Sequence, residues 1–171
     1  YVFGEVQEIA DFCGDSLELS RKARNIGEDI IVFAGVKFMA ETAKILSPEK
    51  TVLLPVENAG CPMADMADSE DVKKLKKKYP DAVYVSYVNS TADLKTEMDI
   101  CCTSGNVEKI ISALPENKKI VFLPDKNLGA NVSKKLNREM ILWDGFCPVH
   151  DKITPETVVR KRNEFPDAEL I

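Results

Sequence analysis

Two stretches of the chain, beginning at Cys61 and Cys147, align without a gap: CPMADMADSEDVKKLKKKYPDAVYV and CPVHDKITPETVVRKRNEFPDAELI. Each opens with a Cys-Pro step and closes with an apolar run after YPDA or FPDA. The interval of 86 residues between the two cysteines is too long for a stacked repeat protein and indicates a duplicated domain. We therefore expect residues 1–86 to form a first α/β repeat and residues 87–171 a second.

Apolar runs alternate with helical patterns in both halves. In order, they are IIVFAG (30–35), KFMAETAKIL (37–46), TVLLPV (51–56), KIVFLP (119–124), LGANVSKKL (128–136) and EMILWD (139–144). Apolar runs without polar alternation are typical of strands covered on both faces, and the helices between them suit right-handed crossovers. The predicted class is α/β with parallel sheets.

Composition narrows the class of protein. A formal net charge of -5 gives no basic face for nucleic acid or anionic lipid. No apolar run reaches the roughly 20 residues of a membrane span, so a cytoplasmic location is expected. Five cysteines, an odd number without paired local spacing, argue against a secreted disulfide scaffold. We expect three of them, Cys13, Cys101 and Cys102, to be buried in apolar segments.

The two Cys-Pro steps follow predicted strands, which places both thiols at the carboxyl ends of strands, where open α/β folds keep their sites. If a rotation axis relates the two repeats, Cys61 and Cys147 face each other across it. Three interpretations stay open: small buried residues, a redox disulfide, or a soft-metal or iron-sulfur site. Such a site needs a further ligand from His150, from another copy of the repeat, or from substrate.

Five polar residues are further candidates for a site. Ser16 and Ser104 are expected to begin helices, as N-caps or as part of a phosphate cradle. Tyr87 and Asn89 are two apart in a predicted strand and so share a face. Either Tyr87 packs in the core and Asn89 caps the next helix, or Tyr87 takes part in acid–base chemistry and Asn89 binds a carboxylate. His150, the only histidine, is either a packing residue or a substrate contact.

Taken together, the motifs resemble the quinolinate synthase family, the A protein of de novo NAD biosynthesis. The matching words are EVQEIADFCGDSLELSRKA, VFAGVKFMAETAKIL, CPMAD, SYVNSTADLK, CTSGN, LPDKNLG and GFCPVH, and they run in family order. The resemblance implies three α/β domains with pseudo-threefold symmetry around a 4Fe-4S cluster that takes one cysteine from each domain. Cys61 and Cys147 match the first two ligands, and the third repeat, with its cysteine, is expected outside this chain.

The resemblance also implies an activity. The family condenses iminoaspartate with dihydroxyacetone phosphate to quinolinate, phosphate and water, with the open iron of the cluster as Lewis acid. A functional link to the enzyme that supplies iminoaspartate follows from this. The matched catalytic residues are Tyr1, Tyr87 and His150, and the matched substrate-binding residues are Ser16, Asn89 and Ser104.

We expect the chain to be about the first two-thirds of such an enzyme, with one cluster ligand too few for activity alone. Two other hypotheses remain open from the residues themselves. One is a non-catalytic phosphate- or metal-binding α/β module, and the other is a thiol-redox protein that uses Cys61 and Cys147.

Overall fold

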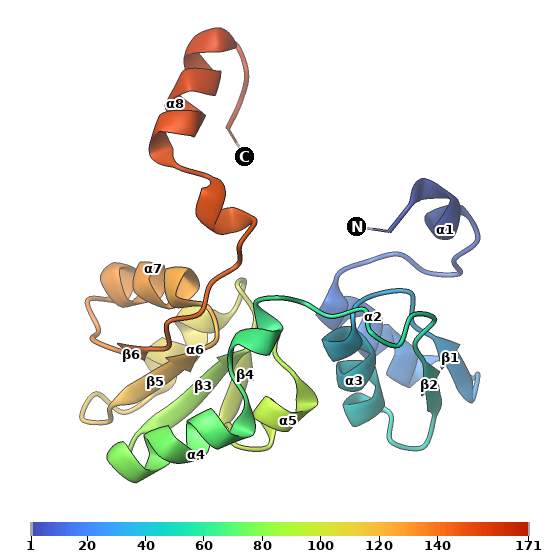
Figure 1. Cartoon of the computed structure of the whole chain (residues 1–171), viewed down its shortest axis with the longest axis horizontal. Helices are drawn as coiled ribbons and strands as arrows, with labels where there is room; N and C mark the ends of the chain where they lie inside the picture. The colour runs from blue at the N-terminus through green and yellow to red at the C-terminus, as the bar shows by residue number, and fades with distance from the viewer. Residues whose placement is uncertain (1, 171) are drawn as a thin grey trace.

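The structure is a computed structural model that describes residues 2–170 (Figure 1). Its helices are α1 (Gly4–Glu8), α2 (Ser16–Asn25), α3 (Lys37–Leu46), α4 (Ser69–Lys78), α5 (Ala92–Lys95), α6 (Val107–Ala113), α7 (Lys126–Leu136) and α8 (Pro155–Glu164), with short 3-10 helices η1 (Ala64–Met66) and η2 (His150–Lys152). Its strands are β1 (Ile30–Val32), β2 (Thr51–Leu53), β3 (Val83–Tyr87), β4 (Ile100–Cys102), β5 (Ile120–Leu123) and β6 (Ile141–Leu142).

The strands form two parallel sheets. One has the order β1-β2 and the other the order β4-β3-β5-β6. In the larger sheet Val85 is in register with Phe122 and with Ile100, so β3 lies between β4 and β5. Each pairing is parallel, which confirms the predicted α/β class with parallel sheets.

The helices begin where short polar side chains accept backbone hydrogen bonds. The capping residues are Asp15, Asp68, Thr91, Asp125 and Thr154, each accepting from a backbone N–H in the first turn. Such N-caps each stabilise a helix by about 1 kcal/mol. The caps are local signals, and the Asp125 cap explains why α7 begins two residues before its predicted start. Helix α3 has the predicted bounds without a side-chain cap.

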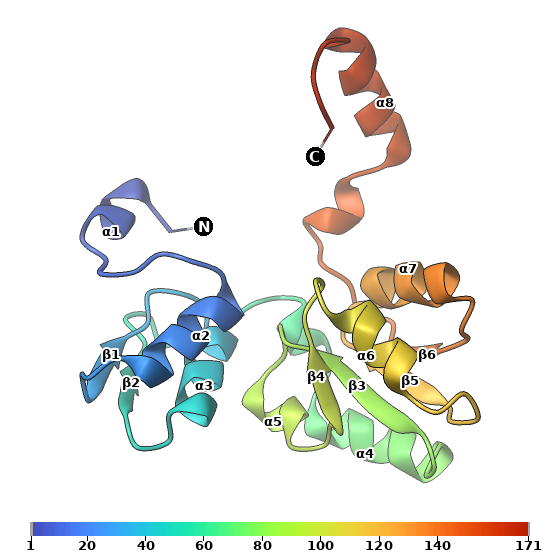
Figure 2. The same cartoon turned by 180° about the vertical axis from the view of Figure 1, so that it is seen from behind.

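Helices cover both faces of the larger sheet. On one face Val85 and Phe122 pack with residues of α6 and α7, among them Ile111. On the other face Tyr84 and Leu123 pack with residues of α4 and α5. Alternate residues of β3 and β5 therefore face opposite helix layers, and all four residues of β5 are buried. The two helix layers lie on either side of the sheet (Figure 2).

The smaller sheet is covered on one face. Ile31 packs against α2 and α3 through a cluster that includes Phe33 and Ala43. The side chains of Ile30 and Val32, which point the other way, are 62% and 63% exposed. The expectation that strands are covered on both faces is therefore correct for β5 and wrong for β1, because no part of residues 2–170 buries this second face.

The order of elements recurs along the chain. The series α2, β1, α3, β2, η1, α4 is followed, after β3, α5 and β4, by α6, β5, α7, β6, η2, α8. The last helix, α8, has no buried residue and projects from the rest of the molecule (Figures 1 and 2). Sheet membership changes between β2 and β3. The repeat boundary expected at residue 86 and the pseudo-threefold relation stay predictions.

Candidate functional site

The two Cys-Pro steps lie in loops of matching conformation. The backbone N–H of Asp65 donates to the carbonyl of Cys61 at 3.0 Å, and that of Asp151 donates to the carbonyl of Cys147 at 2.9 Å. Each turn leads into a 3-10 helix and then into a capped α-helix, α4 or α8. The loops follow β2 and β6, so both cysteines lie beyond the carboxyl ends of parallel strands, as predicted.

The loop after Cys61 contacts the loop before Cys147. The indole N–H of Trp143 donates to the carbonyl of Met66 at 2.9 Å, and the backbone N–H of Phe146 lies 3.3 Å from the Met66 sulfur. Gly145 lies in the same contact region, and glycine is needed there because a Cβ would collide with the carbonyl of Pro124. The structure therefore brings the two cysteine-bearing segments together through Met66.

The five cysteines differ in exposure and chemistry. All five are free thiols, and Cys61 and Cys147 are both half-buried. Burial raises the pKa of the Cys102 thiol to about 12, so Cys102 is a packing residue as expected. Cys13 and Cys101 are exposed, so the prediction that they are buried is wrong. The segment before α2 lies at the surface, and Cys101 lies on edge strand β4, where it faces the opposite way from the buried Cys102.

Within residues 2–170, no group of three or more His, Cys, Asp and Glu side chains is placed to hold a metal ion. The two thiols on adjoining loops are a soft donor set. In donor type they match two ligands of a cluster or soft metal, which would need at least one further ligand from elsewhere. An open hollow beside Cys61 is lined by Lys37, Glu57, Asn58, Gly60 and Asp65.

The two candidate serines lie in different settings. Ser16 is the first residue of α2 and is half-buried, but the helix is capped by Asp15. Ser104 is exposed in the turn before α6, which begins at Val107. The prediction that Ser104 begins a helix is wrong, because the Asn106 side chain accepts from the Thr103 N–H at 2.7 Å and closes a turn there. The proposed anion-binding roles of both serines stay predictions.

Tyr87 is the last residue of β3 and packs against the core cluster that contains Phe122. Its backbone carbonyl accepts hydrogen bonds from the hydroxyls of Ser86 and Ser90, both at 2.9 Å. Asn89 is half-buried in the bend after β3. Because the strand ends at Tyr87, strand alternation does not place the Asn89 side chain, and the two roles stay predictions.

His150 is exposed at the start of η2. Its neighbour Asp151 accepts a hydrogen bond from the Asn127 side chain at 2.9 Å, which ties η2 to α7. Its role as a substrate contact stays a prediction. Tyr1, the remaining candidate, lies outside the described residues.

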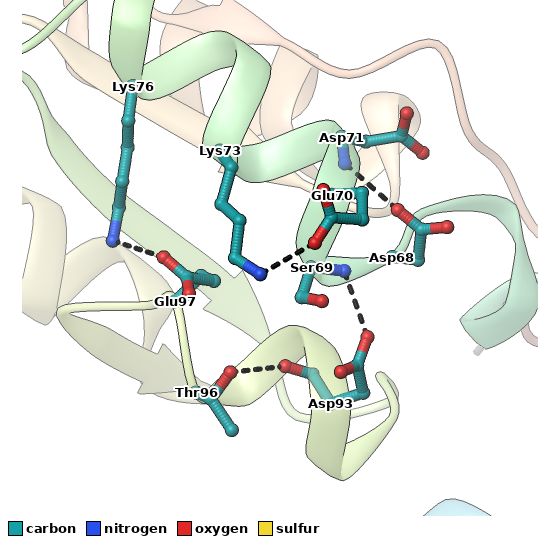
Figure 3. Close-up of polar contacts among 9 residues, drawn as sticks. All are labelled: Asp68, Ser69, Glu70, Asp71, Lys73, Lys76, Asp93, Thr96 and Glu97. Atoms are coloured by element: carbon teal, nitrogen blue, oxygen red, sulfur yellow. Dashed lines mark hydrogen bonds and ion pairs between the residues drawn. The ribbon is translucent and has the colours of Figure 1, made fainter.

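A polar network fixes α4, the helix that follows the Cys61 loop, onto α5 (Figure 3). The Ser69 N–H donates to the Asp93 carboxylate at 3.0 Å, and the Lys76 ammonium lies 2.9 Å from the Glu97 carboxylate. Hydrogen bonds from the backbone and side chain of Ser69 lower the pKa of Asp93. The network holds the segment after Cys61 in place and has a structural role.

Four residues around the site were not singled out from the sequence: Glu41, Met66, Lys95 and Trp143. Trp143 carried one available signal, since it is the only tryptophan and lies four residues before Cys147. The others have no local signal, because Glu41 and Met66 have partners 51 or more residues away and Lys95 has one partner, Thr42, that is 53 residues away.

The fold and the site together define an α/β protein with parallel sheets, in which two cysteine-bearing loops have the same turn and lie in contact. The model of the family described as quinolinate synthetase A protein matches residues 1–171. The chain belongs to this family.

Curated relatives agree with this assignment. The chain is 54% identical over 167 residues to the quinolinate synthase of Desulforudis audaxviator, covering 98% of this chain and 55% of that protein. It is 55% identical over 171 residues to quinolinate synthase 2 of Methanosarcina acetivorans, covering 100% of this chain and 55% of that protein. It is 55% identical over 167 residues to the quinolinate synthase of Aquifex aeolicus, covering 97% of this chain and 52% of that protein. The chain thus spans about half the length of the curated relatives it matches.

Proposed function

We propose that this chain supplies part of a quinolinate synthase of NAD biosynthesis. The reaction condenses iminoaspartate with dihydroxyacetone phosphate and releases phosphate and water as the pyridine ring closes. The proposal rests on family membership and on the names of relatives such as that of Desulforudis audaxviator. The part of those relatives that this chain does not match supplies the remaining ligands and walls of the site.

One structural observation carries the proposal. The segments that bear Cys61 and Cys147 have the same turn and contact each other through Met66. A pair of half-buried thiols on adjoining loops is an arrangement in which thiolates bind soft metals or iron-sulfur clusters. Buried packing residues would need no such matching of the two loops.

In the proposal, Cys61 and Cys147 hold two irons of a 4Fe-4S cluster. When bound, the cluster supplies a Lewis-acidic iron without a cysteine ligand. Three or more ligands are needed, and residues 2–170 hold no group of three or more His, Cys, Asp and Glu side chains that could bind a metal ion. The third cysteine is therefore assigned to the part of the protein that this chain does not include.

The chain's own polar residues bind substrate and move protons in this scheme. Tyr1, Tyr87 and His150 are assigned to proton transfer, since isomerisation and dehydration both need a group that gives or takes a proton. Asn89 donates its amide to a substrate carboxylate. Ser16 and Ser104 bind phosphate or carboxylate oxygens through hydroxyl and backbone N–H groups.

None of the helices between residues 2 and 170 has the length and hydropathy that a membrane crossing requires. The proposal keeps the cytoplasm as the location, where a reducing medium keeps thiols available for a cluster. The unstable iminoaspartate calls for an enzyme that forms it close by, and that enzyme is the proposed functional partner.

Anaerobic reconstitution of the complete gene product with iron and sulfide tests the proposal. We expect a brown protein that forms quinolinate from the two substrates. Cys61→Ala and Cys147→Ala are expected to lose both the colour and the turnover. Cys13→Ala is the matched control, because Cys13 is an exposed thiol outside the two loops, and it is expected to keep both.

Two outcomes contradict the proposal. A colourless wild-type protein that still forms quinolinate would remove the cluster. A complete gene product that lacks a further cysteine-bearing domain and forms no quinolinate would favour the alternative, a non-catalytic phosphate- or metal-binding module.

A further inference from the structure

The segment that carries Asn89 is held by a set of buried hydroxyl groups. Ser86 and Ser90 are fully buried, and their hydroxyl oxygens lie 2.9 Å apart. Each hydroxyl can donate its single proton to the carbonyl of Tyr87, which lies 2.9 Å from both oxygens. The bend of residues 88–90 is therefore fixed at its start to the end of β3.

The same bend is held at its other end by Lys95, which comes from α5. The Lys95 ammonium donates to the carbonyl of Ser90 at 2.5 Å and to the hydroxyl of Thr42 at 3.2 Å. It also lies 5.8 Å from the centre of the Phe38 ring. Thr42 and Phe38 belong to α3, which packs on the smaller sheet, so one side chain connects this bend to the other half of the molecule.

A second contact acts in parallel. The carboxylate of Glu41, also on α3, accepts a hydrogen bond from the backbone N–H of Ala92 at 2.8 Å. Ala92 is the first residue of α5, so Glu41 fixes the start of the short helix whose last residue is Lys95. We name Glu41, Thr42, Ala92 and Lys95 the α3–α5 contact.

Burying the Lys95 ammonium costs free energy, and packing alone does not explain why a charged group is buried there. Desolvation lowers the pKa of Lys95, although nearby Cys101 and Glu41 act to raise it. Removing an ammonium from water is unfavourable unless hydrogen bonds replace its hydration. A methionine would fill similar space without this cost, so the cation is explained by the carbonyl and hydroxyl that it holds.

We propose that Lys95 and Glu41 are positioning residues, which act through the α3–α5 contact to hold residues 88–92, and with them Tyr87 and Asn89, in the geometry that the site needs. The inference rests on the proposed function for the roles of Tyr87 and Asn89. It adds that α3, in the first half of the chain, positions residues 88–92, in the second half, for substrate binding.

The holding of the segment is tested by hydrogen exchange, which does not depend on activity. In the complete gene product, Lys95→Met is expected to raise exchange at the backbone amides of residues 88–92, and Glu41→Gln to raise it most at Ala92. Lys44→Met is the matched control, because the Lys44 ammonium also joins two carbonyls, those of Pro48 and Lys50, away from this bend. Unchanged exchange in Lys95→Met relative to this control would overturn the inference.

The positioning role is tested by kinetics in the same protein. A displaced binding group costs roughly tenfold to a hundredfold, so Lys95→Met is expected to lower kcat/KM by that factor, Lys95→Arg to restore part of it, and Lys44→Met to leave it unchanged. Because Lys95 acts in part through Asn89, the double variant Lys95→Met/Asn89→Ala is expected to lose less kcat/KM than the product of the two single losses, whereas independent effects would multiply.

The exchange and kinetic experiments distinguish the positioning role of Lys95 from the proposed function. An active wild type with an unchanged kcat/KM in Lys95→Met, or with multiplying effects in the double variant, would overturn the positioning role. A wild type that forms no quinolinate, while exchange responds as expected, would count against the proposed function and not against the α3–α5 contact.

Discussion

The indole N–H of Trp143 donates a hydrogen bond to the backbone carbonyl of Met66 at 2.9 Å, across 77 residues of sequence. Trp143 follows β6, and Met66 ends η1, so this bond joins the two cysteine-bearing segments. It explains how two equivalent loops on different sheets come to lie together, and it is open to direct test.

Replacing Trp143 with phenylalanine removes the donor and keeps an aromatic ring. We expect Trp143→Phe to lower the free energy of unfolding by about 1 kcal/mol, since a neutral hydrogen bond contributes about that much and the Met66 carbonyl loses its partner. Urea unfolding measures the change. Phe3→Leu serves as the control, because Phe3 is 82% exposed; an equal loss in both variants would contradict a specific role for the bond.

Gly145 is expected to tolerate no side chain. A Cβ there would collide with the Pro124 carbonyl and lie 3.1 Å from Cδ1 of Trp143, and backbone atoms cannot move aside cheaply. Gly145→Ala should therefore destabilise the protein by about 1–3 kcal/mol and make the Cys147 thiol react faster with an alkylating reagent. In Gly27→Ala, where a Cβ meets nothing within 4 Å, neither quantity should change; the same behaviour in both variants would refute the close approach.

The buried Cys102 thiol should make stability depend on alkaline pH. Its pKa is raised from 9.0 to about 12, chiefly by burial, so between these values the unfolded state loses a proton that the folded state keeps. The unfolded state then binds fewer protons, and the free energy of unfolding falls as pH rises through this window. Cys102→Ala is expected to flatten the fall, and Cys13→Ala to leave it as in the wild type. Urea unfolding at several alkaline pH values measures this dependence. Equal slopes of unfolding free energy against pH in wild type and Cys102→Ala would contradict the role of Cys102.

Asp93 should contribute to stability in the opposite pH range. Hydrogen bonds from Ser69 lower its pKa below the ordinary 3.8, so its contribution is present above that pH and is lost as pH falls through the folded-state value. Asp93→Ala is therefore expected to be less stable than the wild type near neutral pH, with the difference shrinking in acid. Asp167→Ala, at an exposed position, is the control. A difference that stays constant down to low pH would show that the carboxylate charge is not involved.

Much of the fold was predictable because its signals are local. The apolar runs and capping residues fix where strands and helices lie, and α3 has the predicted bounds. Ser104 shows the limit of such signals, because a side-chain turn closed by Asn106 delays α6 to Val107. The exposed face of β1 shows another, since an unbroken apolar run does not say which segment covers each face of a strand.

The candidate site divides in the same way. The sequence by itself determined that two Cys-Pro loops are equivalent, because the 86-residue offset preserves the turn that follows each cysteine. Only the tertiary structure decided that the loops touch through Met66 and that Lys95 and Glu41 hold the segment carrying Asn89. Those contacts join residues that are 51 to 80 positions apart. Their geometry depends on how two sheets pack together, which no local pattern of residues encodes.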